Sequence, residues 1–237
     1  HVRMVEYNIW RFLSESHDSE GRKNLARLKP EEVFLLSGAA CSHDFDKAFD
    51  QLPSGFEHGE GSGAFVVKNR ERLGLNPAEA EAISSAIGLH SIKGDSFRTR
   101  LGDIPNPFAS PLGPVHLRRL VILLKAADIL HADASRISSL IGDGSDLKGI
   151  EKKKYLSRRC TQGWWVDGTR VVVQAKPCDS EQQKIVRECF DYMKNVEWAT
   201  IKEHLESYEL PHELVLADED TDAKAAQETR TKPSSTA

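Results

Sequence analysis

Cysteine is scarce and widely scattered in this sequence. The chain of 237 residues contains four cysteines, Cys41, Cys160, Cys178 and Cys189, and no two of them form a Cys-x-x-Cys pair. This spacing indicates neither a zinc knuckle nor a disulfide framework. We therefore expect the protein to work in a reducing compartment, of which the cytoplasm is the simplest.

Long apolar runs and a strong net charge are missing as well. No run of about 18 apolar residues occurs and the first residues do not have a signal-peptide pattern, so we expect no membrane partner. The formal net charge of -4 and the pI of about 6.2 give no overall attraction to nucleic acid or to an anionic membrane. The sequence also has no glycine-rich phosphate loop and no internal repeat.

Apolar residues recur at helical spacing over most of the first half of the chain. Pro30 followed by two glutamates is typical of a helix start, because proline fixes φ and the acids complement the helix dipole. Asn76 is the expected N-cap of another helix. The predicted helices of this half cover residues 1–13, 30–44, 58–66, 77–90 and 115–131.

The pattern changes in the second half of the chain. Asp167-Gly168 between two apolar β-rich runs predicts a β-hairpin over residues 164–173, and a long amphipathic helix is expected over 180–208. Residues 91–114, which contain several glycines and prolines, are expected to be irregular. We divide the chain into a helical domain (1–150), a hairpin and helix annex (151–216) and a disordered polar tail (217–237).

Six residues of the helical half are potential metal ligands, in the order His, His-Asp, His, His, Asp. Each lies at the end of a predicted helix or inside an apolar one, where desolvation is costly unless a partner such as a metal ion compensates it. The six residues are His1, His43, Asp44, His58, His90 and Asp128.

Four of these residues, His43, Asp44, His58 and His90, also have a purely structural interpretation. An isolated His-Asp pair is a weak signal that is often a satisfied helix end. His58 alone is interpreted as a surface residue at a helix start, and His90 alone as a partner of the helix dipole. The order of the six residues together is what favours a metal site.

The ordered set resembles the pattern of the HD-domain superfamily of metal-dependent phosphohydrolases, which is named for its His-Asp doublet. The resemblance implies a mainly α fold, an HD-domain helical bundle, with the small C-terminal β-hairpin and long helix as an annex outside the family core. It covers roughly residues 1–140, and the stretches that carry it are 1–5, 39–47, 58–62, 86–90 and 125–130.

The resemblance also implies a ligand assignment. The first metal ion would be bound by His1, His43, Asp44 and Asp128, and a second, where present, by His58 and His90, with Asp44 bridging the two ions. Imidazoles mixed with carboxylates favour a divalent transition metal, one or two ions of Fe, Mn, Co, Ni or Zn.

The function implied by the resemblance is hydrolysis of a small phosphorylated substrate, a nucleotide or related phosphate ester, through a metal-bound hydroxide. Asp44 and Lys47 are the expected catalytic residues. Lys47 lies one helical turn after His43, where it would also bind the phosphate. Lys93, Arg98 and Arg100 are further candidates for binding the substrate.

Two other functions fit the same residues. A non-catalytic HD-fold regulatory or signalling module is favoured by the terminal ligand His1, by the C-terminal annex and by His131, which stands where relatives commonly have an acidic residue. Asp133, two residues later, is the candidate to replace that acid. A di-iron oxygenase is the other function.

The basic clusters 152–154 and 158–159 are interpreted as solvated surface or as a contact with nucleic acid or another subunit. No pattern specifies an oligomeric state.

Overall fold

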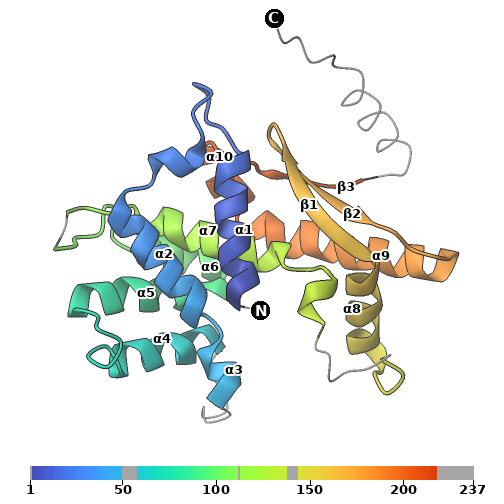
Figure 1. The fold of residues 1–237 in the computed structure, drawn as a ribbon, viewed down its shortest axis with the longest axis horizontal. Helices are drawn as coiled ribbons and strands as arrows, with labels where there is room; N and C mark the ends of the chain where they lie inside the picture. Colours follow the sequence, from blue (N-terminus) through green and yellow to red (C-terminus); the bar gives the residue numbers. More distant parts are fainter. Residues whose placement is uncertain (1, 50–57, 112, 138–143, 218–237) are drawn as a thin grey trace, which may run out of the picture.

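The chain folds mainly into α-helices, with a small three-stranded sheet formed by its C-terminal part (Figure 1). A computed structural model describes residues 2–49, 58–111, 113–137 and 144–217. His1 and residues 218–237 of the predicted tail lie outside the described residues. No helix in the described part of the chain has the length and apolar character needed to cross a bilayer.

Helices form most of the chain before the first strand, and further helices lie between the second and third strands. The α-helices are α1 (Val2–Glu15), α2 (Pro30–Ser42), α3 (Phe45–Phe49), α4 (His58–Lys68), α5 (Pro77–His90), α6 (Gly94–Asp103), α7 (Leu117–Leu130), α8 (Gly149–Cys160), α9 (Ser180–Tyr192) and α10 (Lys202–Ser207). Shorter turns are the 3-10 helices η1 (Asn24–Arg27), η2 (Ala134–Arg136) and η5 (Trp198–Thr200) and the π-helix η4 (Met193–Glu197). The strands are β1 (Thr161–Asp167), β2 (Arg170–Ala175) and β3 (Glu213–Leu216).

Local sequence signals determine where the helices next to the site begin. Asn76 Oδ1 accepts a hydrogen bond from Glu79 N at 2.9 Å, and Glu79 Oε2 accepts one from Asn76 N at 2.8 Å, which forms a capping box at the start of α5. Pro30 starts α2, and Glu32 in its first turn accepts a hydrogen bond from Lys29 N at 3.0 Å. Both predicted helix starts are confirmed.

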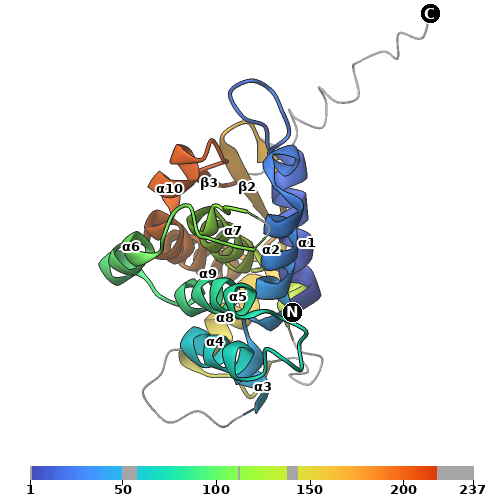
Figure 2. The same cartoon turned by 90° about the vertical axis from the view of Figure 1, so that its left-hand side faces the viewer.

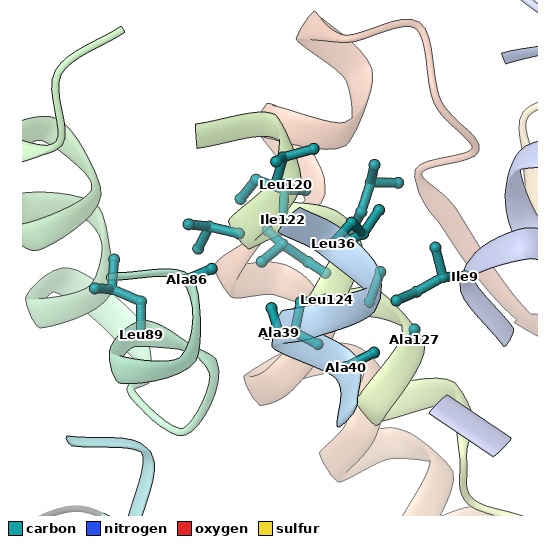
Figure 3. Close-up of a cluster of buried hydrophobic side chains, with 14 of the residues drawn as sticks. Ile9, Leu36, Ala39, Ala40, Ala86, Leu89, Leu120, Ile122, Leu124 and Ala127 are labelled. Atoms are coloured by element: carbon teal, nitrogen blue, oxygen red, sulfur yellow. The ribbon is translucent and has the colours of Figure 1, made fainter. Parts of the chain in front are cut away.

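Helix α7 is the centre of the molecule. In Figure 2 it lies between α1 and α2 on one side and α6 on the other, with α5 below it. It packs against α1, α2 and α5, and its apolar side chains are almost completely buried. Figure 3 shows Leu120, Ile122 and Leu124 of α7 among Leu36 of α2 and Ile9 of α1. This packing holds rigidly the helices that carry the candidate ligands.

The region 91–114, which we predicted to be irregular, contains helix α6. Only Phe97 and Leu101 of this helix are buried, so its sequence has too few apolar residues to show a helical period. Helix α8 was not predicted either, because only Tyr155 and Cys160 of its residues are buried.

The predicted long final helix is interrupted. It ends at Tyr192, continues as η4 and η5, and resumes as α10. Trp198 at the interruption is 1% exposed, and its indole Nε1 donates a hydrogen bond to His212 O at 2.8 Å. Tertiary contacts of this buried tryptophan therefore override the local preference for a continuous helix.

The predicted β-hairpin is confirmed, and a third strand joins it. Gly168 in the turn has φ of 61°, a conformation that favours glycine. β1 and β2 pair antiparallel with Trp164 opposite Val173, and β3 pairs parallel with β2. We did not predict β3, since a strand of four residues shows no period of its own.

The apolar core continues from the helical part into the sheet. Phe12 of α1 packs edge-on against Trp164 of β1, with 6.3 Å between ring centroids, and Arg11 lies over the same tryptophan ring. One cluster of buried side chains includes residues on both sides of residue 150. The division of the chain at that residue stays a prediction.

Candidate metal centre

Five of the six candidate ligands lie together in the structure, and we call them the ligand cluster. His43 caps the end of α2, Asp44 follows it, His58 begins α4, His90 ends α5 and Asp128 lies near the end of α7. The sixth, His1, lies outside the described residues.

Asp44 is at the middle of the ligand cluster. Its Oδ2 lies 3.6 Å from His43 Nε2, and its Oδ1 lies 3.6 Å from His58 Nε2 and 3.7 Å from His90 Nε2. His43 Nε2 is also 4.0 Å from Asp128 Oδ1. One ligand atom from each of His43, Asp44 and His90 lies within 4.8 Å of the other two, a spacing that one ion could join.

Backbone carbonyls fix the ring orientation of two histidines. His43 Nδ1 lies 2.8 Å from Ala40 O, and His90 Nδ1 lies 2.6 Å from Ile87 O. A carbonyl only accepts, so each Nδ1 is the nitrogen that carries the proton. The lone pair of each Nε2 therefore points toward the centre of the ligand cluster, as in protein metal sites where the second ring nitrogen is held by a hydrogen bond.

His58 reaches the ligand cluster because α4 approaches α5 very closely. A Cβ on Gly59 would lie 2.6 Å from Ile87 O and 3.0 Å from His90 Nδ1, so only glycine fits there. The close approach leaves His58 Nε2 and His90 Nε2 3.0 Å apart. The first turn of α4 thus delivers His58 beside the more deeply buried His90.

The protonation states of the ligand cluster suit a metal ion. Burial lowers the pKa of His43, and burial together with the positive charge of Lys47 lowers the pKa of His58 to about 4. Burial raises the pKa of the Asp44 carboxyl, but His90, His43 and Lys47 outweigh it and hold this pKa well below its ordinary value. At neutral pH the cluster therefore presents the neutral imidazoles of His43 and His58 and the ionised carboxylate of Asp44.

This donor set fits a divalent transition metal. Imidazole nitrogen mixed with carboxylate oxygen suits Fe, Mn, Co, Ni or Zn, whereas oxygen ligands alone suit Mg or Ca. His43, Asp44 and His90 would hold such an ion, with Asp128 and His58 on either side of them.

The basic residues predicted to bind substrate are placed differently from one another. Lys47 Nζ lies 2.8 Å from Asp44 Oδ1 and is half-exposed beside the ligand cluster. Lys93 pairs with Glu197 at 2.7 Å, and Arg98 pairs with Asp95 of its own helix at 3.2 Å.

Arg100 pairs with Glu60 at 2.6 Å. Glu60 lies two residues after His58, in the first turn of α4. Of the four predicted basic residues, Lys47 is the one for which the structure gives a direct contact with the ligand cluster.

His131 and Asp133, where the sequence departs from the family pattern, lie in a hydrogen-bonded turn after α7. His131 is completely buried, and its Nε2 lies 3.0 Å from Ser135 Oγ. Asp133 caps η2 by accepting hydrogen bonds from Ser135 N at 2.9 Å and Ser135 Oγ at 2.6 Å. These contacts stabilise the turn that follows α7.

Sequence reasoning missed the role of Lys125. This lysine is 2% exposed, and its Nζ donates hydrogen bonds to His90 O at 2.7 Å and Ile92 O at 2.6 Å. Burial lowers its pKa to about 8. Lys125 thus joins α7 to the end of α5 that carries His90. The sequence signal that could have revealed this role is a single lysine within the apolar helix that also carries Asp128.

A second missed residue is Arg136, which contacts the C-terminal end of α7. Its Nη2 lies 3.4 Å from Asp128 Oδ1, and its Nη1 donates to the backbone oxygens of Asp128 at 3.2 Å and of His131 at 3.0 Å. Burial raises the pKa of Asp128, but Arg136, with His90 and His43, outweighs it and keeps the carboxyl ionised. No local sequence pattern marks Arg136.

A helical bundle in which a His-Asp doublet, two further histidines and a distant aspartate meet at helix ends defines an HD-type domain. The model of the HD-CE family matches residues 1–204, and the chain belongs to this family. The resemblance to HD domains seen in the sequence is thereby confirmed. A search of curated proteins finds no match.

Proposed function

We propose that this protein is a metal-dependent phosphohydrolase that acts on a nucleotide or related phosphate ester. The observation that carries the proposal is the convergence of His43, Asp44 and His90, whose ligand atoms lie within 4.8 Å of one another. Membership of an HD-type family supports it. Its four cysteines, none of them in a disulfide, fit a cytoplasmic protein.

The residues of the ligand cluster have distinct roles in this proposal. His43, Asp44 and His90 hold the ion, and the carbonyls of Ala40 and Ile87 keep the two imidazoles oriented toward it. When bound, a divalent ion activates water at neutral pH and polarises a phosphoryl oxygen.

Lys47 is the residue best placed to meet the phosphate. Its side chain is 49% exposed, so its ammonium reaches solvent as well as Asp44. A cation at the edge of the ligand cluster donates hydrogen bonds to phosphoryl oxygens and stabilises the negative charge that develops during hydrolysis. We assign this role to Lys47. The proposed reaction needs no nucleophilic side chain.

The contact between Lys47 and Asp44 also supports a second candidate, a non-catalytic HD-fold regulatory module. Lys47 Nζ at 2.8 Å offsets the charge of the Asp44 carboxylate without an ion. A module of this kind would keep the helical fold and the ligand cluster for signalling or assembly rather than for hydrolysis.

Metal analysis of matched variants tests the proposal. We expect His43→Ala and Asp44→Asn to lose most of the transition metal measured by elemental analysis of the purified protein, together with hydrolysis of a panel of phosphomonoesters, phosphodiesters and nucleotides. His116→Ala is the control, since His116 is exposed and lies outside the ligand cluster. Full metal content and unchanged hydrolysis in both variants would contradict the proposal, and metal binding without any hydrolysis would favour the regulatory module.

A further inference from the structure

The segment that follows His90 is held by the C-terminal annex, residues 151–216. Lys93 lies three residues after His90, at the N-cap of α6. Its Nζ donates hydrogen bonds to Glu197 Oε1 at 2.7 Å and to Tyr192 Oη at 3.0 Å. Lys93 and Glu197 are 104 residues apart in the sequence, so this contact joins the helical half of the chain to the annex.

A π turn brings the two partners of Lys93 together. Tyr192 and Glu197 are five residues apart, whereas neighbours on one face of an α-helix are three or four residues apart. Residues 193–197 form the π-helix η4, in which the hydrogen bonds join residues five apart. The interruption of the final helix therefore lets a carboxylate and a phenol from one side of the turn reach the same ammonium.

A second contact from the annex holds the residue next to Lys93. Gly94 N donates a hydrogen bond to Thr200 Oγ1 at 3.3 Å, and this hydroxyl donates to Val196 O at 2.7 Å. Thr200 is 4% exposed, so the contact lies inside the molecule. Gly94 has φ of 60°, a conformation that favours glycine and directs the chain into α6. The annex therefore holds two consecutive residues rather than a single exposed side chain.

His90 depends on this segment because it is the last residue of α5. The last carbonyls of a helix have no partner within the helix and need other donors. Lys125 Nζ supplies hydrogen bonds to His90 O at 2.7 Å and to Ile92 O at 2.6 Å from the α7 side. The same final turn contains Ile87 O, which orients the His90 ring toward the ligand cluster. Without the contacts to the annex, α7 would hold the segment after His90 from one side only.

We propose that the annex completes the metal centre, with Glu197 as a positioning residue that holds His90 through Lys93. The inference rests on the metal centre of the proposed function and does not depend on hydrolysis of a phosphate ester. It gives Lys93 a role different from the substrate binding expected from the sequence, because Glu197 and Tyr192 occupy its ammonium. The annex is then part of the site rather than an addition to it.

Binding of Co²⁺ to the full chain tests the inference without requiring turnover, since the visible absorption of the ion reports its binding. We expect Glu197→Ala and Lys93→Met each to weaken Co²⁺ binding by about three- to tenfold. This is less than the roughly 10- to 100-fold cost of removing a group that hydrogen-bonds a metal ligand directly. The double variant should bind no more weakly than either single variant, because both substitutions break the same contact.

NMR of the Co²⁺-loaded protein distinguishes positioning from a general loss of stability. Bound Co²⁺ shifts the Nδ1–H signals of the histidines that hold it, and His90→Ala identifies the signal of His90 by its absence. In Glu197→Ala this signal should move or broaden, whereas that of His43, which Ala40 O holds on α2, should stay unchanged. A Glu197→Ala protein with both signals and the Co²⁺ affinity unchanged would overturn the inference.

Glu188→Ala is the matched control. Glu188 of α9 pairs with Lys153 of α8 at 2.7 Å, the same distance as between Glu197 and Lys93, and the pair lies within the annex. Its removal changes the net charge by the same amount and should alter Co²⁺ affinity by less than about twofold. Equal weakening in Glu188→Ala and Glu197→Ala would show a general charge effect and overturn the inference.

Two further variants keep the test decisive if Glu197→Ala does not fold. Tyr192→Phe removes one hydroxyl from a residue that is 48% exposed, and it should weaken Co²⁺ binding by about two- to threefold. Lys93→Arg keeps the charge and should restore most of the affinity that Lys93→Met loses. Unchanged affinity in both Tyr192→Phe and Lys93→Met would overturn the inference.

The outcomes for the inference and for the proposed function are separate. A protein that hydrolyses nothing, but binds Co²⁺ more weakly after Glu197→Ala, contradicts the proposed function and supports the inference. Hydrolysis by a protein whose Co²⁺ affinity does not depend on Glu197 overturns only the inference.

Discussion

At the scale of the residue, the ligand cluster depends on which ring nitrogen of each histidine carries the proton. The carbonyls of Ala40 and Ile87 accept from the Nδ1 atoms of His43 and His90, so both Nε2 atoms meet the carboxylates as lone pairs. Burial also lowers the pKa of His43 and keeps this imidazole neutral near pH 7. A metal ion therefore competes with fewer protons here than at exposed histidines.

His131 gives a prediction on the pH dependence of stability. It is fully buried, and burial lowers its pKa from 6.5 to about 4. Below pH 6.5 His131 is protonated in the unfolded chain but stays neutral in the folded chain. The free energy of unfolding therefore falls as the pH falls from 6.5 to about 4. We expect His131→Asn to remove up to about 3 kcal/mol of this pH dependence, measured by urea unfolding at several pH values.

The control for this prediction is His116→Asn, because His116 is exposed. It should leave the curve of unfolding free energy against pH unchanged. An unaltered curve in His131→Asn would show that His131 is protonated equally in both states.

At the scale of the element, the packing of α4 on α5 decides whether His58 joins the ligand cluster. We expect Gly59→Ala to push α4 away, because the new Cβ would lie 2.6 Å from the backbone oxygen of Ile87. The variant should lose about 1–3 kcal/mol of stability in urea unfolding, as overpacked sites do, and bind a divalent metal more weakly.

Gly102→Ala is the matched control for Gly59→Ala, since a Cβ at Gly102 of α6 meets nothing within 4 Å. It should be neutral or stabilising. Equal stability and metal affinity in the two variants would contradict the role assigned to the close approach of α4 and α5.

The sequence predicts elements well where the signal is local. Pro30 and Asn76 mark helix starts through contacts within one turn, and the order of histidines and aspartates marks the ligand cluster through chemistry that few other functions need. Helix α6 was missed because two buried residues, Phe97 and Leu101, do not define a period.

The positions of Arg136 and Glu197 could not be predicted for a different reason. Arg136 meets the end of α7, and Glu197 meets Lys93, only after separate elements pack together. Nothing within one turn of either residue specifies that packing. Tertiary structure alone brings these groups together.

At the scale of the whole molecule, the apolar core connects the helices to the sheet. Trp164 of β1 is 4% exposed and packs on Phe12 of α1, which belongs to the helical part. We expect Trp164→Ala to lower the free energy of unfolding by about 3–5 kcal/mol and to reduce hydrogen-exchange protection in α7 as well as in the sheet.

The neighbouring residue Trp165 provides the control, since it is half-buried and alternates to the other face of β1. Trp165→Ala should cost clearly less stability. If Trp164→Ala instead loosened only the sheet and left exchange in α7 unchanged, the two parts of the chain would unfold independently.

The central claim is that the ends of α2, α5 and α7 build a metal centre. The most direct measurement is anomalous diffraction, at the absorption edge of the bound metal, from crystals equilibrated with Mn²⁺ or Zn²⁺. We predict a peak about 2.0–2.2 Å from the Nε2 atoms of His43 and His90 and from a carboxylate oxygen of Asp44. A protein that folds as described and shows no peak among these side chains, or shows its metal elsewhere, would contradict the account.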